Sequence, residues 1–246
     1  MSEGSIDHRS QDGLRVITIN RPAKRNAMTA DMCDQLRAAW LAFRDSPDRV
    51  AVLRGEGGVF TAGADLSSPP PRFWQAVPGL GVDIGKPVIA AVHGPVVGLG
   101  VTLVAFCDLC VASTEARFIY PEARVGVAAG AIASIAARIP HKIAMELMLL
   151  GEPIAAQRAY EAGLVNRVAE PGRELEVALE LARSAARGAP LVLKFLQRMT
   201  AETLPRSPIE AMYRAQAQAD TVAQSEDAQE GLRAFAERRP PRFEGR

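Results

Sequence analysis

Short branched segments and longer helical repeats alternate along the first two-thirds of the chain. The segments Leu14–Asn20, 50–54 and Val88–Val92 are rich in β-branched residues and are bounded by glycine or proline, a pattern that favours strands. The third is apolar throughout, as is typical of a strand buried on both faces of a sheet. We therefore expect these segments to be strands, the last two of them buried.

Helical patterns lie between and after these strands. Thr29 is positioned to cap a helix that buries Met32, Leu36, Trp40 and Phe43, because these apolar residues recur at helical spacing. Further along, the pattern predicts a strand over Arg117–Ile119, helices over about 131–150 and 154–162, and a short strand over 164–168.

From Arg173 onward the pattern is helical only. Gly188 is a typical helix stop, Pro190 opens the next helix, and residues 207–210 have the spacing of a capping box. The sequence thus predicts an α/β fold, with an α/β core over residues 1–188 and a helical carboxyl-terminal module over residues 189–246.

Charge and hydropathy exclude several classes of protein. A net charge of +1 gives no electrostatic case for nucleic acid or an anionic membrane as partner. Residues 88–107 carry no formal charge over a length that can span a bilayer, but His93-Gly94-Pro95, Gly98 and Gly100 interrupt them. We expect a strand, a turn and a new helix there, and no membrane span.

The amino terminus lacks the apolar core of a secretory signal, which favours the cytoplasm.

Common metal and nucleotide motifs are incomplete. Cys107 and Cys110 have the spacing of a zinc or redox pair, but no second ligand pair accompanies them, so we predict buried, reduced thiols and no metal site. Gly98-Leu99-Gly100 begins like a dinucleotide fingerprint, yet Leu103 stands where its third glycine belongs. We expect no bound cofactor.

Two glycine-rich segments carry a positive signal. Residues 58–66 (GVFTAGADL) follow a buried strand, and residues 93–100 (HGPVVGLG) lie where a strand gives way to an apolar helix. Small residues in the first leave main-chain N–H groups accessible, and donors at a helix start carry positive partial charge. Each segment alone is also typical of a tight turn, but together they suit the binding of one oxygen between two amides.

In this order the segments resemble the enoyl-CoA hydratase/isomerase (crotonase) family. The first is similar to its G-x-x-F-[ST]-A-G-x-D-[LI] signature, and the second, followed by Cys107-Asp108, to its G-x-x-x-G-x-G signature. Residues 20–28, 162–166 and 235–243 match further family segments. The resemblance implies a crotonase-like spiral of ββα units whose carboxyl-terminal helices close the pocket and mediate homotrimers, or dimers of trimers.

The resemblance also implies the site. Ala64 N–H and Leu99 N–H would form an oxyanion hole for the carbonyl of an acyl-CoA or enoyl-CoA thioester, with coenzyme A entering as part of the substrate. The implied coenzyme A contacts are Lys24, Arg25, Ala27, Ala62, Ala64, Asp65 and Leu66.

The acid–base groups differ from those of the family's hydratases, which carry two glutamates. Thr102 stands at the first position and does not ionise at neutral pH, although it can orient water. Glu122, in Pro121-Glu122-x3-Gly126, stands at the second. One carboxylate suffices to move a double bond, so the resemblance implies an isomerase rather than a hydratase.

Several alternatives stay open. Residues 127–131 replace the family's proline and paired glycines after Gly126, so Glu122 is alternatively a structural or surface carboxylate. The chain would then be a non-catalytic acyl-CoA-binding homologue, and decarboxylation or thioester hydrolysis is a third hypothesis. Other candidates also have non-catalytic interpretations. Asp65 and Asp108 could hold turns, and Lys24 and Arg25 could be ordinary solvated surface residues. The residues near the carboxyl terminus could form a solvated tail; they are Arg238, Arg239, Arg242 and Phe243.

Overall fold

A six-stranded sheet forms the centre of the molecule. The computed structural model describes residues 4–127 and 130–246. The strand order is β1 (Ser5–Gln11), β2 (Leu14–Asn20), β3 (Val50–Gly55), β4 (Val88–Val92), β6 (Leu109–Ser113) and β9 (Arg167–Ala169). Only the β1–β2 pair is antiparallel. The strands predicted over Leu14–Asn20, 50–54 and Val88–Val92 are present as β2, β3 and β4, and the sheet that contains them is largely parallel.

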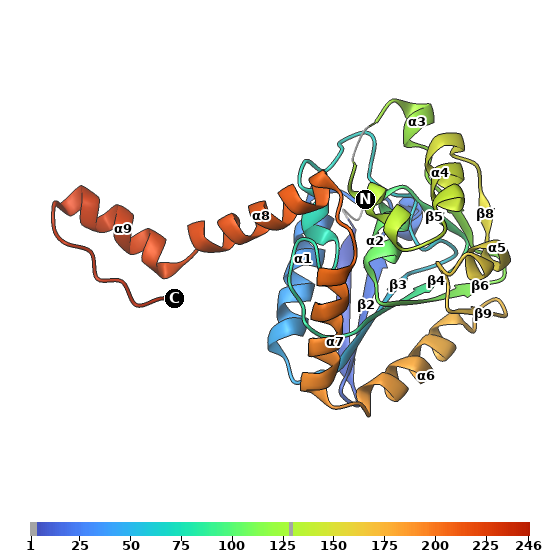
Figure 1. Cartoon of the computed structure of the whole chain (residues 1–246), viewed down its shortest axis with the longest axis horizontal. Coiled ribbons are helices and arrows are strands. Elements are labelled where there is room, and N and C mark those ends of the chain that lie inside the picture. Colours follow the sequence, from blue (N-terminus) through green and yellow to red (C-terminus); the bar gives the residue numbers. More distant parts are fainter. Residues whose placement is uncertain (1–3, 128–129) are drawn as a thin grey trace.

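Helices cover both faces of this sheet (Figure 1). On one face, α1 (Ala30–Asp45) buries Trp40 and Leu36 against Ile17 and Leu53 of the sheet. On the other, α6 (Glu174–Ala186) packs Ala178 onto a second, smaller apolar cluster. The predicted cap of α1 is present, because the Thr29 side chain accepts a hydrogen bond from Met32 N.

Short strands after β4 and β6 build a second, three-stranded sheet. It contains β5 (Pro95–Val97), β7 (Arg117–Ile119) and β8 (Ile154–Ala155). Each of the first two is followed by a helix, α2 (Leu99–Phe106) after β5 and α3 (Glu122–Val125) after β7. The chain thus repeats a ββα unit, and both β5 and β7 deliver the start of a helix to the same place.

Three predicted elements need correction. The helix expected over about 131–150 is a 3-10 helix, η3 (Ala131–Ala137), followed by α4 (His141–Leu150), because Pro140 cannot continue a helix. The helix expected over 154–162 begins later, as α5 (Ala156–Glu161), since its first two residues form β8. The strand expected over 164–168 lies at β9, where it pairs with β6.

The last helices extend the chain away from the sheet. They are α7 (Pro190–Thr203), α8 (Pro208–Ala223) and α9 (Glu226–Glu237). The predicted stop and start around Gly188 and Pro190 are present, and Ser207 caps α8 by accepting from Glu210 N. In Figure 1, α7 runs beside the core, whereas most of α8 and all of α9 project from it. Two 3-10 turns complete the described elements, η1 (Pro22–Lys24) and η2 (Phe73–Ala76).

The start of α8 returns to the core through aromatic contacts. The Tyr213 ring stacks on Trp74 of η2 at 5.2 Å between ring centroids and meets Phe73 edge-on at 5.9 Å. No helix within residues 4–127 and 130–246 has the length and apolar character that a bilayer span requires.

Candidate active site

The first glycine-rich segment is held in place by a buried asparagine. Asn26 adopts a left-handed conformation at φ 56° and is fully buried. Its side-chain amide donates to the carbonyl oxygens of Glu56 (2.8 Å) and Val59 (2.7 Å), and its Oδ1 accepts from Arg21 N. These bonds tie the η1 turn to the loop that follows β3, so both move as one unit.

The direction of the Ala64 N–H group follows from its neighbours. Gly63 O accepts from Met28 N at 2.8 Å, and a trans peptide points its N–H opposite to its C=O. The Ala64 N–H therefore points away from Met28. Gly63 has φ 90°, and a Cβ there would lie 2.9 Å from Val97 O, so this position requires glycine.

The second glycine-rich segment lies directly against the first. Val97 N donates to Thr61 O at 3.0 Å, and a Cβ built on Gly63 would lie 3.6 Å from Leu99 N. Gly98 O accepts from Thr102 N inside α2, so the Leu99 N–H points out of the amino-terminal end of that helix. The two predicted donor peptides are thus neighbours.

Glu122 lies beside the second segment. Its Oε1 is 2.8 Å from the position that a Cβ on Gly98 would occupy, and Gly98 precedes Leu99. The β5–β7 pairing of Val97 with Ile119 brings α3 to this position. Glu122 is only partly exposed, and its buried Oε2 accepts no hydrogen bond within the part of the chain that the structure describes. A solvated surface carboxylate does not fit this environment.

The protonation of Glu122 follows from that burial. Loss of hydration disfavours the charged form and raises the pKa of Glu122 to about 7. The Tyr120 hydroxyl is also affected, because its own burial and the nearby Glu122 charge raise the Tyr120 pKa. Ala128 and Ala129, in the changed loop after Gly126, lie outside the described residues.

Thr102 faces the peptide that carries the Leu99 donor. The threonine is 3% exposed, and its Oγ1 lies 3.5 Å from Gly98 O, at the outer limit of a hydrogen bond. The side chain is therefore directed along α2 toward the helix start.

The predicted coenzyme A residues lie on two adjoining segments. Ala62 N donates to Arg25 O at 2.9 Å, which sets residues 24–27 alongside residues 62–66. The Lys24, Arg25 and Leu66 side chains are exposed, whereas Ala27, Ala62, Ala64 and Asp65 are partly exposed. These residues form one continuous strip of surface beside the Ala64 amide.

Asp65 holds a local turn, whereas Asp108 bonds to two segments that are distant in the sequence. Asp65 accepts from the Ser67 hydroxyl and amide and pairs with Arg21 at 2.7 Å; these bonds, led by that of the hydroxyl, lower its pKa to about 2. Asp108 accepts from Val88 N at 2.8 Å and from the Gln197 side chain at 2.9 Å. Both acidic groups therefore already have partners within the chain.

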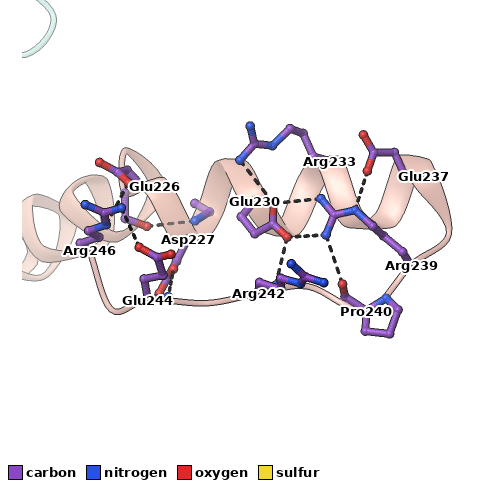
Figure 2. Close-up of polar contacts among 12 residues, drawn as sticks. Glu226, Asp227, Glu230, Arg233, Glu237, Arg239, Pro240, Arg242, Glu244 and Arg246 are labelled. Carbon is purple, nitrogen blue, oxygen red and sulfur yellow. Dashed lines mark hydrogen bonds and ion pairs between the residues drawn. The ribbon is translucent and has the colours of Figure 1, made fainter.

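The carboxyl-terminal tail folds back on α9, far from these segments (Figures 1 and 2). Arg239 pairs with Glu230 at 2.6 Å, and the amides of Glu244 and Gly245 donate to Asp227. A cavity of about 660 Å³ between α9 and the tail is lined by charged side chains and includes no predicted catalytic residue. The cavity is therefore separate from the paired glycine-rich segments.

All three cysteines are free thiols, with Cys33 and Cys110 buried and Cys107 partly buried. Burial raises the pKa of Cys110, and also that of Cys107, above the ordinary range for a thiol. Among the described residues, no group of three or more histidine, cysteine or acidic side chains is arranged to hold a metal ion.

Asn26 and Thr61 were not identified as site residues from the sequence. Both act through hydrogen bonds to residues about thirty positions away, and local patterns carry no signal for such contacts. The available signal was the presence of short polar residues inside otherwise small or apolar segments, where burial requires a hydrogen-bond partner.

The sheet, the ββα repeat and the two facing glycine segments define a class of α/β proteins built from repeated ββα units. The sequence profile described as "Enoyl-CoA hydratase/isomerase" matches residues 9–246, and the chain belongs to this family. It is 36% identical to a putative enoyl-CoA hydratase of Thermus thermophilus, over 94% of this chain and 97% of that protein. It is 34% identical to the 2,3-dehydroadipyl-CoA hydratase of Escherichia coli, over 96% of this chain and 97% of that one.

Solved structures show the same fold. An enoyl-CoA hydratase of Mycobacterium tuberculosis matches with a TM-score of 0.75 at 35% identity, covering 98% of this chain and 99% of that one. An enoyl-CoA hydratase/isomerase of Pseudoalteromonas atlantica matches with a TM-score of 0.76 at 29% identity, covering 97% and 99%. The predicted crotonase-like α/β fold with a helical carboxyl-terminal part is confirmed.

Proposed function

We propose that this acyl-CoA enzyme moves a double bond from the 3 to the 2 position of an enoyl-CoA thioester. In this proposal Ala64 N–H and Leu99 N–H bind the thioester oxygen, and Glu122 transfers the proton. The observation that carries it is the position of Glu122, whose partly desolvated carboxylate lies against Gly98, next to the Leu99 donor.

The proposed reaction uses one base twice. Ionised Glu122 removes a proton from C2 of the 3-enoyl thioester, and the electron pair moves onto the thioester oxygen as a dienolate. Protonated Glu122 then returns the proton at C4, which leaves the double bond between C2 and C3. A pKa of about 7 suits both steps, because the group readily accepts and donates a proton near neutral pH.

The amide donors stabilise the charge that develops in the first step. A fixed donor aimed at such an oxyanion contributes roughly 3 kcal/mol to transition-state stabilisation in comparable sites. Both donors lie in main-chain positions fixed by hydrogen bonds, at Gly63 O and Gly98 O, so little reorganisation accompanies the reaction. Thr102 is placed to support the Leu99 peptide rather than to act as a second base.

The exposed strip beside Ala64 is the proposed coenzyme A site. Lys24 and Arg25 carry positive charge to pair with phosphates, and the small side chains of Ala27 and Ala62 allow close approach of the ligand. Leu66, 62% exposed, offers an apolar contact. Asp65 contributes by holding this turn through Arg21.

Residues 189–246 are proposed to form a homotrimer in the cytoplasm, with dimers of trimers as the higher assembly, and their projecting part (Figure 1) would close the pocket of a neighbouring copy rather than that of its own chain. Leu232, Phe235 and Phe243 are 74%, 87% and 62% exposed on the projecting part of the chain. Large apolar side chains gathered at such a site favour burial against another protein surface.

The test compares wild type with Glu122→Gln on 3-enoyl and 2-enoyl thioesters, with acyl-CoA binding measured separately by calorimetry. We expect the isomerisation kcat to fall at least about 100-fold while affinity is retained. Glu152→Gln is the matched control, since that glutamate is exposed and pairs with Arg124. Tight binding without turnover of either substrate by the wild type would instead support a non-catalytic acyl-CoA-binding protein.

Hydration is a second candidate, because the relatives above are named as hydratases. Hydration requires a base for water and a proton source for C2. Two carboxylates supply these most simply, and Thr102 stands where the second would be expected. Thr102→Glu is therefore expected to raise the ratio of hydration to isomerisation. A wild type that hydrates 2-enoyl thioesters as fast as it isomerises 3-enoyl thioesters would overturn the isomerase proposal in favour of the hydratase.

A further inference from the structure

One buried side chain touches both glycine-rich segments. Thr61 lies in the first segment, is fully buried, and forms an isolated parallel bridge with Val96 of the second. Its carbonyl oxygen accepts from Val97 N at 3.0 Å. The residue therefore stands at the junction between the Ala64 loop and the strand that leads to Leu99.

The Thr61 hydroxyl has a fixed polarity. It donates its proton to Asn26 O at 2.6 Å and accepts from Gly63 N at 3.0 Å. A hydroxyl has one proton, so the bond to the Asn26 carbonyl leaves a lone pair directed at Gly63 N–H. Gly63 is the residue before Ala64, and its two peptide groups are thereby held by Thr61 on one side and by Met28 on the other.

The Thr61 methyl group faces the second segment. Its Cγ2 lies 2.6 Å from the position that a Cβ on Gly100 would occupy, so the methyl fills the space above the second residue of α2. Gly100 follows Leu99, the second proposed donor. The hydroxyl thus fixes one donor loop while the methyl packs against the other.

We propose that Thr61 is a positioning residue that sets the separation and direction of the Ala64 and Leu99 amides. This inference rests on the proposed function, in which those amides bind the thioester oxygen. Thr61 itself does not touch the substrate, and its effect is transmitted through Gly63 and through the contact with Gly100.

The test uses isosteric variants and a spectroscopic probe. Thr61→Val keeps the shape and loses the hydroxyl, whereas Thr61→Ser keeps the hydroxyl and loses the methyl. The probe is butyryl-coenzyme A, isotope-labelled at the carbonyl carbon, whose infrared carbonyl stretch reports polarisation by hydrogen-bond donors when bound. Isomerisation kcat, KM and melting temperature are measured on the same proteins.

We expect Thr61→Val to lower kcat about tenfold with KM changed less than about twofold, and to reduce the carbonyl shift seen in the wild type. Thr61→Ser should retain most of the shift. Should Thr61→Val fail to fold, Thr61→Ser and Thr61→Ala form the second comparison, because both lack the methyl and they differ only in the hydroxyl.

The outcomes separate the two proposals. A wild-type shift that persists unchanged in Thr61→Val, or that is equal in Thr61→Ser and Thr61→Ala, overturns the role of Thr61 and leaves the proposed function standing. A wild type that binds the probe without any carbonyl shift overturns the thioester-oxygen site itself. A lower melting temperature with unchanged kcat and shift reduces Thr61 to a structural residue.

Discussion

The α/β core and the last three helices are stabilised in different ways. Strands β3 and β4 bury all their apolar side chains, and helix α1 buries one apolar face on which Trp40 and Phe43 are inaccessible to solvent. Across α7, α8 and α9, the buried residues are Glu210, Glu230 and Ala234 alone, while α7 leaves Leu191 81% exposed.

Polar contacts dominate at the far end of the chain. Figure 2 shows Arg239 between Glu230 and Glu237, and the tail amides on Asp227. The Arg239–Glu237 pair is exposed, and exposed ion pairs contribute little to stability. The comparison teaches that the core buries its own apolar side chains and positions the site. The last helices instead leave apolar side chains exposed, which contact with a further protein surface would bury.

The largest expected effect belongs to the core. Trp40→Ala removes a fully buried indole and the hydrogen bond from its Nε1 to Ala76 O. We expect the free energy of unfolding to fall by about 3–5 kcal/mol. Chemical denaturation followed by circular dichroism measures this, and a loss below about 1 kcal/mol would contradict the central role of this cluster.

A substitution at the site comes next. Gly98→Ala places a Cβ 2.8 Å from Glu122 Oε1 at φ 52°, so it both strains the helix start and displaces the carboxylate. We expect an isomerisation kcat about 100-fold lower. Gly163→Ala is the control, since Gly163 also has positive φ but has no atom within 4 Å of the added Cβ. Equal losses in the two variants would refute a specific effect on Glu122.

A smaller effect comes from the charge of Glu122. Burial raises the pKa of Glu122 from 4.5 in the unfolded chain to about 7 in the folded chain. The folded state therefore loses stability as the pH rises from about 4.5 to about 7, and the loss is complete above about pH 7. Below about pH 4 both states are protonated and the group has no effect. Glu122→Gln should therefore stabilise the protein by about 1–2 kcal/mol at about pH 8, less than the full shift implies because the group is partly exposed. Thermal unfolding of the variant and the wild type across this pH range measures the difference in stability. A stabilisation by Glu122→Gln that is largest at low pH would contradict the prediction.

The smallest effect on the folded chain is expected in α9. Phe235 is 87% exposed, so Phe235→Ala should change the unfolding free energy of the isolated chain by less than about 0.5 kcal/mol. The same variant should weaken self-association, which analytical ultracentrifugation measures. Unchanged self-association would show that Phe235 does not contribute to the proposed trimer contacts.

Continuous apolar runs made the core predictable from sequence. The predictions for Leu14–Asn20 and Val88–Val92 coincide with β2 and β4, because the first is rich in branched residues and the second is apolar throughout. Strand β1 was missed, since its residues after Ile6 are exposed and show no apolar alternation. Strand β5 was missed as well; it is three residues long and was expected as part of a turn.

For the candidate site, the sequence predicted that the two glycine-rich segments lie together, and in the structure they meet. The positive φ of Gly63 and Gly98 was found only in the structure. The roles of Asn26 and Thr61 were not predictable, because they depend on hydrogen bonds between distant segments. The environment of Glu122 also needed the structure, since burial and not sequence context raises its pKa.

The most direct test of the account is proton exchange at C2 of bound butyryl-coenzyme A in deuterium oxide, followed by nuclear magnetic resonance. This reaction requires only a base near C2 and donors at the thioester oxygen. The account predicts exchange that increases with pH through about 7, is lost in Glu122→Gln and persists in Glu152→Gln. Binding without exchange by the wild type, or full exchange by Glu122→Gln, would contradict it.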